Sequence, residues 1–184
     1  ESLVRWQRRV EDALGPRPFN NEKIYGSDEA TRGTMGGSNG AVRKFWRAVF
    51  AGCASVRFHR PDCGIGLSPL AQRCIRAMRT FERSFDLFDS RPDVSFTPAD
   101  GIEAYCLRTP DGAAAYYLPD GVCALPAGEA GVVWIDATGQ REPVIGAGAC
   151  PPSEGDWVAV VGQRPTRQEA TAHREMACVA ELPR

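Results

Sequence analysis

The stretch Arg17-Pro-Phe-Asn-Asn-Glu-Lys-Ile-Tyr-Gly26 is the segment of this chain that best indicates its fold. It predicts a short buried strand over 17–22, which ends on the carboxylate of Glu22 and is followed by a Gly-, Ser- and Thr-rich loop. Acidic residues are rarely buried unless they are paired, so a Glu at the end of an apolar strand requires an explanation. At the carboxyl-terminal rim of a parallel barrel, the explanation is usually catalysis.

The segments around this strand alternate between helix and strand. Gly15-Pro16 is a helix stop signal, and Ser68-Pro69 is a helix start signal with Pro at the first helical position. Alternation of this kind predicts parallel strands joined by crossover helices. The predicted elements, in chain order, are a helix over 2–14, the strand over 17–22, a helix over 41–51, a strand over 54–59 and a helix over 68–87.

The second half of the chain has a different pattern, which begins after the polar, Pro-containing linker 89–93. From about residue 94 to 162, short apolar runs alternate with turn signals such as Thr109-Pro-Asp-Gly112, which predicts a small antiparallel β-sandwich. The predicted strands are 102–108, 113–118, 122–125, 132–136, 142–145 and 157–161. The expected fold class is therefore α/β followed by all-β, with domains at 1–90 and 94–162 and a polar tail at 163–184.

Composition excludes several classes of function. The net charge of −1 and the absence of a basic cluster interleaved with aromatics argue against nucleic acid, and no stretch is long and apolar enough to span a bilayer. The two histidines lie far apart and no CxxC occurs, so no metal is expected. The glycines after the first strand lack the spacing of a phosphate loop, so no nucleotide cofactor is expected either.

The cysteines leave the redox compartment open. Cys106 and Cys123 fall in adjacent predicted strands and can form a disulfide, but a reduced core is equally consistent with the pattern. The first residues of the given sequence lack the basic, apolar and small-residue pattern of a signal peptide. Because the chain opens inside a predicted helix, we expect it to be a portion of a longer protein.

Candidate functional residues follow from the rule that side chains at the ends of barrel strands carry the chemistry. The rule selects Asn20, Asn21 and Glu22 from the first strand and Arg57, His59 and Arg60 from the second, of which Asn21, Glu22, Arg57 and His59 are taken as candidate site residues. Tyr25, in the loop after Glu22, can stack on a sugar or hydrogen-bond to that carboxylate. The plain structural alternative is a salt bridge between Glu22 and an arginine of the second strand end, with His59 as a wall residue.

Three tryptophans are expected to be buried rather than to bind a ligand. Trp46 lies on the apolar stripe of the helix over 41–51, and Trp134 and Trp157 lie on predicted sandwich strands.

Two motifs in these segments resemble a known family. Arg17-Pro-Phe-Asn-Asn-Glu-Lys-Ile-Tyr25 resembles the K-P-(hydrophobic)-x-x-E-x-x-Y strand end of the apiosidase-like glycoside hydrolases. Val42-Arg-Lys-Phe-Trp-Arg-Ala-Val-Phe-Ala-Gly-Cys-Ala54 resembles the R-x-x-x-W-x-x-(x)-L-x-G-A-A helix and strand that follow there, with Cys53 in place of the first Ala. Segments 68–88 and 94–162 are similar in order and length to the family's last barrel helix and its collagen-binding-like β-sandwich.

The resemblance implies that residues 1–88 are the last part of a (β/α)8 barrel, in which 17–22 is strand seven and 54–59 is strand eight. Glu22 then matches the nucleophile of a retaining glycosidase, and the general acid comes from strand four, outside this chain. The implied substrate is a carbohydrate, no cofactor is required, and the implied location is secreted or periplasmic. The implied partner is an N-terminal barrel segment or a second chain, without which the chain alone is expected to be inactive.

The resemblance also implies roles for the other selected residues. Asn21 and Tyr25 would orient Glu22 or contact the sugar, and Arg57 and His59 would border the sugar subsite. Asn-Glu is also the dipeptide of the acid/base position on strand four of related barrels, but too little barrel follows Glu22 for that placement. A rival hypothesis is a non-catalytic carbohydrate- or protein-binding β-sandwich module with a scaffold barrel remnant. A third is a decayed barrel that has lost its acid.

Overall fold

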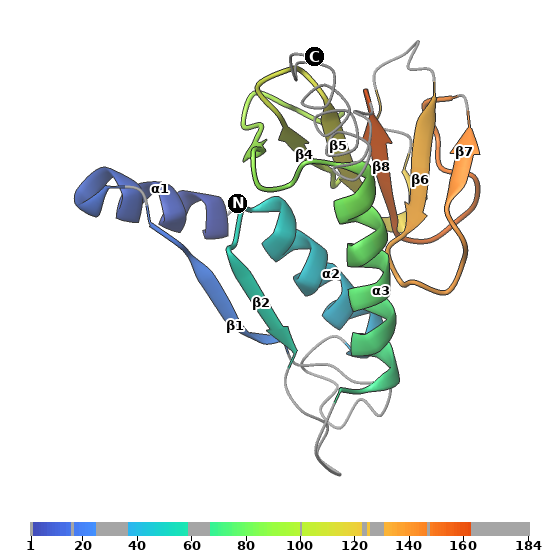
Figure 1. Cartoon of the computed structure of the whole chain (residues 1–184), viewed down its shortest axis with the longest axis horizontal. Coiled ribbons are helices and arrows are strands. Elements are labelled where there is room, and N and C mark those ends of the chain that lie inside the picture. Colours follow the sequence, from blue (N-terminus) through green and yellow to red (C-terminus); the bar gives the residue numbers. More distant parts are fainter. Residues whose placement is uncertain are drawn as a thin grey trace, which may run out of the picture.

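The computed structural model of the chain describes residues 2–15, 17–24, 37–58, 67–99, 101–122, 125, 131–146 and 148–162. Two groups of elements follow one another along the chain (Figure 1). The first contains α1 (Ser2–Leu14), β1 (Asn20–Ile24), α2 (Gly37–Phe50), β2 (Ser55–Phe58) and α3 (Pro69–Ser84). The second contains β3 (Arg91–Pro92), β4 (Tyr105–Arg108), β5 (Ala114–Leu118), the 3-10 turn η2 (Pro119–Gly121), β6 (Val132–Asp136), β7 (Val144–Gly146) and β8 (Trp157–Val161).

The first group contains the parallel pairing that the sequence predicts. β1 pairs with β2 in parallel, and α2 is the crossover helix between them. The start of α3 is also as predicted, because the Ser68 Oγ accepts a hydrogen bond from the Ala71 N–H and Pro69 occupies the first turn. β1 begins three residues later than the predicted strand, at Asn20. Pro18 has no N–H to donate to a ladder, which disfavours an earlier start.

The second group forms one antiparallel sheet of six strands in the order β3-β4-β5-β8-β6-β7. Its central strands β5, β8 and β6 are buried along their whole length, which fits their Ala- and Val-rich sequences. Two predictions are wrong here. Arg91–Pro92 of the expected linker forms the edge strand β3, a position where Pro is tolerated. Val122 and Leu125 lie outside any strand, because the chain leaves β5 through the turn η2, with Asp120 at φ 62°.

The helices α2 and α3 lie between the parallel pair and the six-stranded sheet (Figure 1). On one side of α2, Phe45 stacks on Phe58 of β2 with ring centroids 5.2 Å apart. On the other side, Trp46 stacks on Tyr117 of β5 at 6.2 Å, and its Nε1–H donates a 2.7 Å hydrogen bond to the carbonyl of Ala137. The expectation that Trp46 belongs to the core is therefore confirmed.

The Ala137 carbonyl is held in place by the tight turn after β6. Both carboxylate oxygens of the buried Asp136 accept hydrogen bonds from this turn, including those of the Thr138 and Arg141 N–H groups. Gly139 has a φ of 67°, and a Cβ there would lie 2.2 Å from the Arg73 carbonyl of α3. Only glycine therefore lets this turn approach α3 so closely.

The opposite face of the sheet carries a second apolar cluster, in which Tyr116, Trp134 and Trp157 pack with Phe96. Trp134 and Trp157 are 2% and 1% exposed, so the expectation that both are buried is confirmed. Cys106 belongs to the same cluster as a free thiol, and burial raises its pKa to about 11. Cys150 forms a disulfide.

The fold is therefore mixed α/β, with a helical layer on a six-stranded antiparallel sheet. One hydrophobic cluster includes α2, α3 and the inner face of the sheet, so the two groups of elements share a core. Within the described residues the strands from Arg91 to Val161 form a single sheet. The second sheet of a sandwich, the identity of the first group as a barrel segment and the domain bounds stay predictions.

Trp46→Phe should lower the free energy of unfolding by about 1–3 kcal/mol, measured by urea denaturation. The substitution keeps an aromatic ring but leaves the Ala137 carbonyl without its donor and a gap beside Tyr117. Trp6→Phe, at a side chain that is 55% exposed, is the control and should change this free energy by less than about 0.5 kcal/mol. Equal effects of the two substitutions would show that the Trp46 contacts do not stabilise the core.

Candidate functional site

Of the candidate site residues selected from the sequence, the structure describes Asn21 and Glu22 on β1 and Arg57 on β2, so these three lie on neighbouring parallel strands. Asn21 of β1 is in register with Val56 of β2, next to Arg57. On β2, Ser55 and Arg57 are exposed, whereas Phe58 is buried against α2. The pair therefore has an apolar face toward the helices and a polar face turned away from them. Both α2 and α3 begin at this same end of the strands (Figure 1).

A register shift, of the kind that a β-bulge produces, interrupts the pairing of β1 between Asn21 and Ile24. Asn21 pairs with Val56 and Ile24 pairs with Phe58, so three steps along β1 correspond to two steps along β2. The extra residue keeps Ile24 on the helix side, where it is 1% exposed. Bulges of this kind occur preferentially at the rims of barrels and next to active sites, because they change the direction in which a side chain projects.

The sequence therefore predicted the parallel pairing of these strands but not the local geometry around Glu22. It predicted Glu22 as the last residue of its strand, whereas Glu22 is the third residue of β1 and lies within the register shift. For Asn21 and Glu22 the structure describes the backbone alone. Tyr25 and His59, the remaining two predicted site residues, lie outside the described residues. The roles assigned to all five residues stay predictions.

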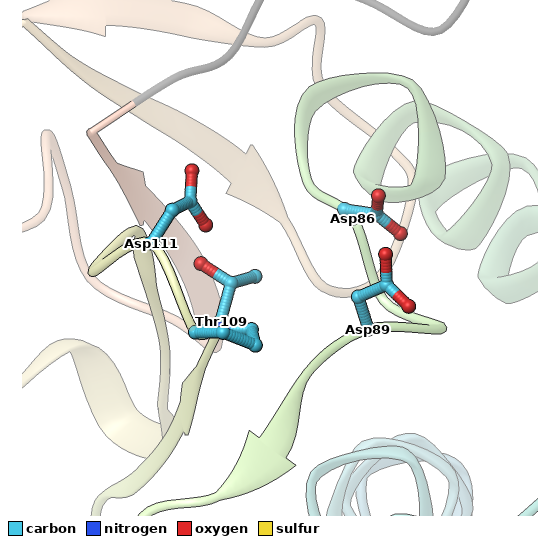
Figure 2. A pocket seen from close by; sticks show the side chains of 5 residues that line it. Asp86, Asp89, Thr109 and Asp111 are labelled. Atoms are coloured by element: carbon cyan, nitrogen blue, oxygen red, sulfur yellow. The ribbon is translucent and has the colours of Figure 1, made fainter.

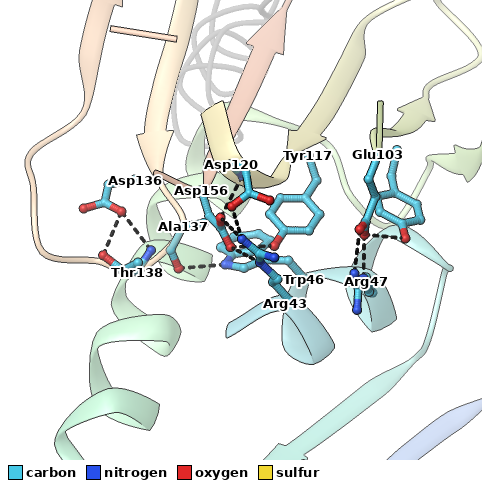
Figure 3. Close-up of polar contacts among 11 residues, drawn as sticks. Arg43, Trp46, Arg47, Glu103, Tyr117, Asp120, Asp136, Ala137, Thr138 and Asp156 are labelled. Carbon is cyan, nitrogen blue, oxygen red and sulfur yellow. Dashed lines mark hydrogen bonds and ion pairs between the residues drawn. The ribbon is translucent and has the colours of Figure 1, made fainter. Parts of the chain in front are cut away.

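A second polar cluster joins α2 to the sheet (Figure 3). Asp156, whose side chain is 9% exposed, accepts hydrogen bonds from the Arg43 Nε and Nη2 at 3.3 Å, from the Tyr117 hydroxyl at 3.1 Å and from the Asp120 N–H at 2.9 Å. Arg43 also forms an ion pair with Asp120. Burial raises the pKa of Tyr117 well above its ordinary value, and the negative charge of Asp156 raises it further. The Tyr117 hydroxyl therefore keeps its proton and stays a donor.

A third cluster lies one helical turn further along α2. Arg47 donates two 2.6 Å hydrogen bonds to Glu103, one from Nε and one from Nη2, and the Tyr105 hydroxyl donates to the same carboxylate at 2.7 Å. The bond from Arg47 lowers the pKa of Glu103, and burial raises the pKa of Tyr105 to about 12. In both clusters each carboxylate is matched by an arginine, which fits a structural joint better than a reactive centre.

The far end of α3 borders a small depression of about 180 Å³, lined by Asp86, Asp89, Thr109, Pro110 and Asp111 (Figure 2). Its volume is below the roughly 300–1,000 Å³ of common ligand pockets. No group of three or more His, Cys, Asp or Glu side chains in the described part of the chain is arranged to hold a metal ion. α3 has 16 residues, so the depression lies about 24 Å along it from the carboxyl ends of β1 and β2.

Sequence reasoning missed both arginine clusters. Arg43 and Asp156 are 113 positions apart, and Arg47 and Glu103 are 56 apart. No local sequence pattern pairs residues that are so far apart. A signal was nevertheless present, because a charged side chain on the apolar helix over 41–51 or beside a predicted strand needs a partner of opposite charge. None of the described helices is both long enough and apolar enough to cross a bilayer.

Comparisons of this chain with protein-family models, with curated proteins and with solved structures found no match.

The stability of the wild-type protein should fall more steeply than that of Glu103→Gln as the pH drops below about 4.3, the ordinary pKa of a glutamate. The pKa of Glu103 is lower in the folded state, so its stabilisation is complete above that ordinary value and is lost as the pH falls through the folded pKa. Both side chains of the Arg47–Glu103 pair are 39% exposed, so the effect should stay below about 1 kcal/mol.

Urea midpoints measured between pH 3 and pH 7 test this expectation. Glu142→Gln, at an exposed residue remote from Arg47, is the control and should follow the wild type. Parallel curves for wild type and Glu103→Gln would contradict a contribution of this ion pair.

Proposed function

We propose that this chain is the C-terminal portion of a retaining glycoside hydrolase, in which Glu22 is the nucleophile. The observation that carries the proposal is the bulge-like register shift between Asn21 and Ile24, a stretch that includes Glu22, near the carboxyl end of the first strand of a parallel β–α–β unit. Parallel strands of this kind end at a common rim, which is where βα barrels place their catalytic side chains. The strand and helix motifs that resemble the apiosidase-like hydrolases give the proposal its reaction class.

The polar face of the parallel pair supports a barrel as the complete form of the first group of elements. Ser55 and Arg57 are exposed on that face, and Arg57 directly precedes the last residue of β2, at the end of the strands where βα barrels place their catalytic side chains. Parallel sheets occur almost exclusively with both faces covered, and β1 and β2 form a sheet of only two strands among the described residues. Further strands would complete the sheet and cover the polar face.

In the proposed reaction, a carboxylate oxygen of Glu22 attacks the anomeric carbon of the sugar. The glycosidic bond breaks, and a general acid gives its proton to the departing oxygen. The same residue, now a carboxylate, takes a proton from a water molecule that attacks the anomeric carbon, so the glycosyl-enzyme ester is hydrolysed and Glu22 is released as a carboxylate. Retention requires the two carboxyl groups to lie about 5–5.5 Å apart. We assign the general acid to a segment outside residues 1–184, and positioning and sugar-binding roles to Asn21, Tyr25, Arg57 and His59.

The exposed apolar side chains of α1 support the need for another polypeptide segment. α1 carries Leu3, Trp6, Val10 and Leu14 at helical spacing, but Trp6 is 55% exposed and Leu14 is 59% exposed. In Figure 1, α1 extends away from the rest of the molecule. Exposed apolar stripes of this kind mark contact surfaces, and the barrel hypothesis gives this one a partner.

The non-catalytic module has less support. A sugar-binding face on the sheet needs exposed aromatic side chains, whereas the described aromatic residues of the sheet strands, Tyr116, Tyr117, Trp134 and Trp157, are at most 2% exposed, and Tyr105 is half-buried. We therefore assign the sheet, which we infer to be part of a β-sandwich, the role of a support for the barrel segment. The disulfide at Cys150 fits the secreted or periplasmic location that the resemblance implies.

Glu22→Gln in the complete hydrolase should reduce turnover of aryl glycosides by about 10³-fold or more, because the amide cannot act as the nucleophile. Glu82→Gln, on the surface of α3, is a matched control and should retain activity. A fluorinated glycoside that traps the covalent intermediate should label Glu22 in the wild type, as peptide mass spectrometry would detect. Unchanged turnover of Glu22→Gln, or labelling of another residue, would eliminate the proposed role.

A further inference from the structure

We propose that Arg43 is a positioning residue for the reaction, which connects the antiparallel sheet to the strand that carries Glu22. The inference rests on the nucleophile role proposed above. In this proposal the antiparallel sheet fixes the position of the amino-terminal half of α2. That half of the helix lies nearest to the carboxyl ends of β1 and β2.

The first step of the argument is the anchor on the sheet. Arg43 lies in the amino-terminal half of α2 and binds Asp156, which directly precedes β8, and Asp120, which follows β5 (Figure 3). Asp156 also accepts from the Tyr117 hydroxyl and the Asp120 N–H, so its carboxylate is fixed from three directions. A buried carboxylate held in this way constrains its arginine partner to one position.

The second step is the contact from α2 to the strands. Phe45, two residues after Arg43, stacks on Phe58 at the end of β2 with ring centroids 5.2 Å apart. Phe58 is in register with Ile24, the residue that follows the bulge in β1. Ile24 is 1% exposed and belongs to the same hydrophobic cluster as Val42 and Phe45 of α2. A shift of α2 therefore moves the backbone on the carboxyl side of Glu22.

The third step is a comparison of the two arginines on α2. Arg47 also binds a carboxylate of the second group of elements, Glu103, but it lies one turn further from the start of the helix. If the ion pairs merely hold the two groups of elements together, loss of either arginine should have the same kind of effect. If Arg43 positions Glu22, its loss alone should affect the chemical step, since small misplacements of reacting groups reduce rates by up to about 100-fold.

The experiment compares Arg43→Met with Arg47→Met in the complete hydrolase, at a temperature at which both variants are folded by circular dichroism. We expect Arg43→Met to reduce kcat by about 10- to 100-fold with KM within about twofold of wild type, and Arg47→Met to leave kcat within about twofold. Arg43→Lys, which keeps the positive charge, should recover part of the lost kcat. Equal kcat values for Arg43→Met and Arg47→Met would overturn the proposal.

Hydrogen exchange provides a readout that does not depend on the reaction. Arg43→Met should accelerate amide exchange in Asn20–Ile24 and Ser55–Phe58 relative to Arg47→Met. Equal exchange in the two variants would overturn the connection between Arg43 and the strands, even if Glu22 is the nucleophile. Faster exchange in Arg43→Met together with unchanged turnover in Glu22→Gln would leave the connection in place and refute the glycosidase mechanism instead.

Discussion

The packing of α2 between two sheets is the constraint on which the rest of the structure depends. The apolar stripe of α2 is broad enough to contact both sheets at once. Phe45 packs against Phe58 of the parallel pair, and Trp46 packs against Tyr117 of the antiparallel sheet. A helix that is buried on two sides fixes both neighbours relative to each other, because close-packed interiors deform very little. The hydrogen bond from the Trp46 Nε1–H to the Ala137 carbonyl fixes the orientation of the Trp46 ring in this contact.

Charge adds a second requirement to the same interface. Asp156 is buried, and a buried carboxylate without a partner is strongly destabilising. Arg43 is placed to neutralise it only when α2 lies in its observed position on the sheet. The ion pair thus contributes orientation more than net stability, since the cost of desolvating two charges offsets much of their attraction. The proposed position of Glu22 depends on this orientation through Phe58 and Ile24.

The candidate site was predictable in part. The alternation of helix and strand signals around Glu22 predicted the parallel pair, because strand and helix signals are local properties of the sequence. The bulge was not predictable, since it arises where Ile24 must stay against α2 while β1 keeps its pairing with β2. The edge strand at Arg91–Pro92 was missed for a similar reason, as it pairs with β4, which follows only after the Pro-containing stretch 93–104.

By itself, the sequence determined the type and order of most elements and the burial of Trp46, Trp134 and Trp157, because amphipathic spacing and turn residues act over a few positions. Only the tertiary structure decided that the strands after residue 90 form one six-stranded sheet in the described chain and that α2 packs on it. It alone paired Arg43 with Asp156 across 113 positions. Long-range contacts of this kind depend on which surfaces are complementary after folding, and no local pattern records that.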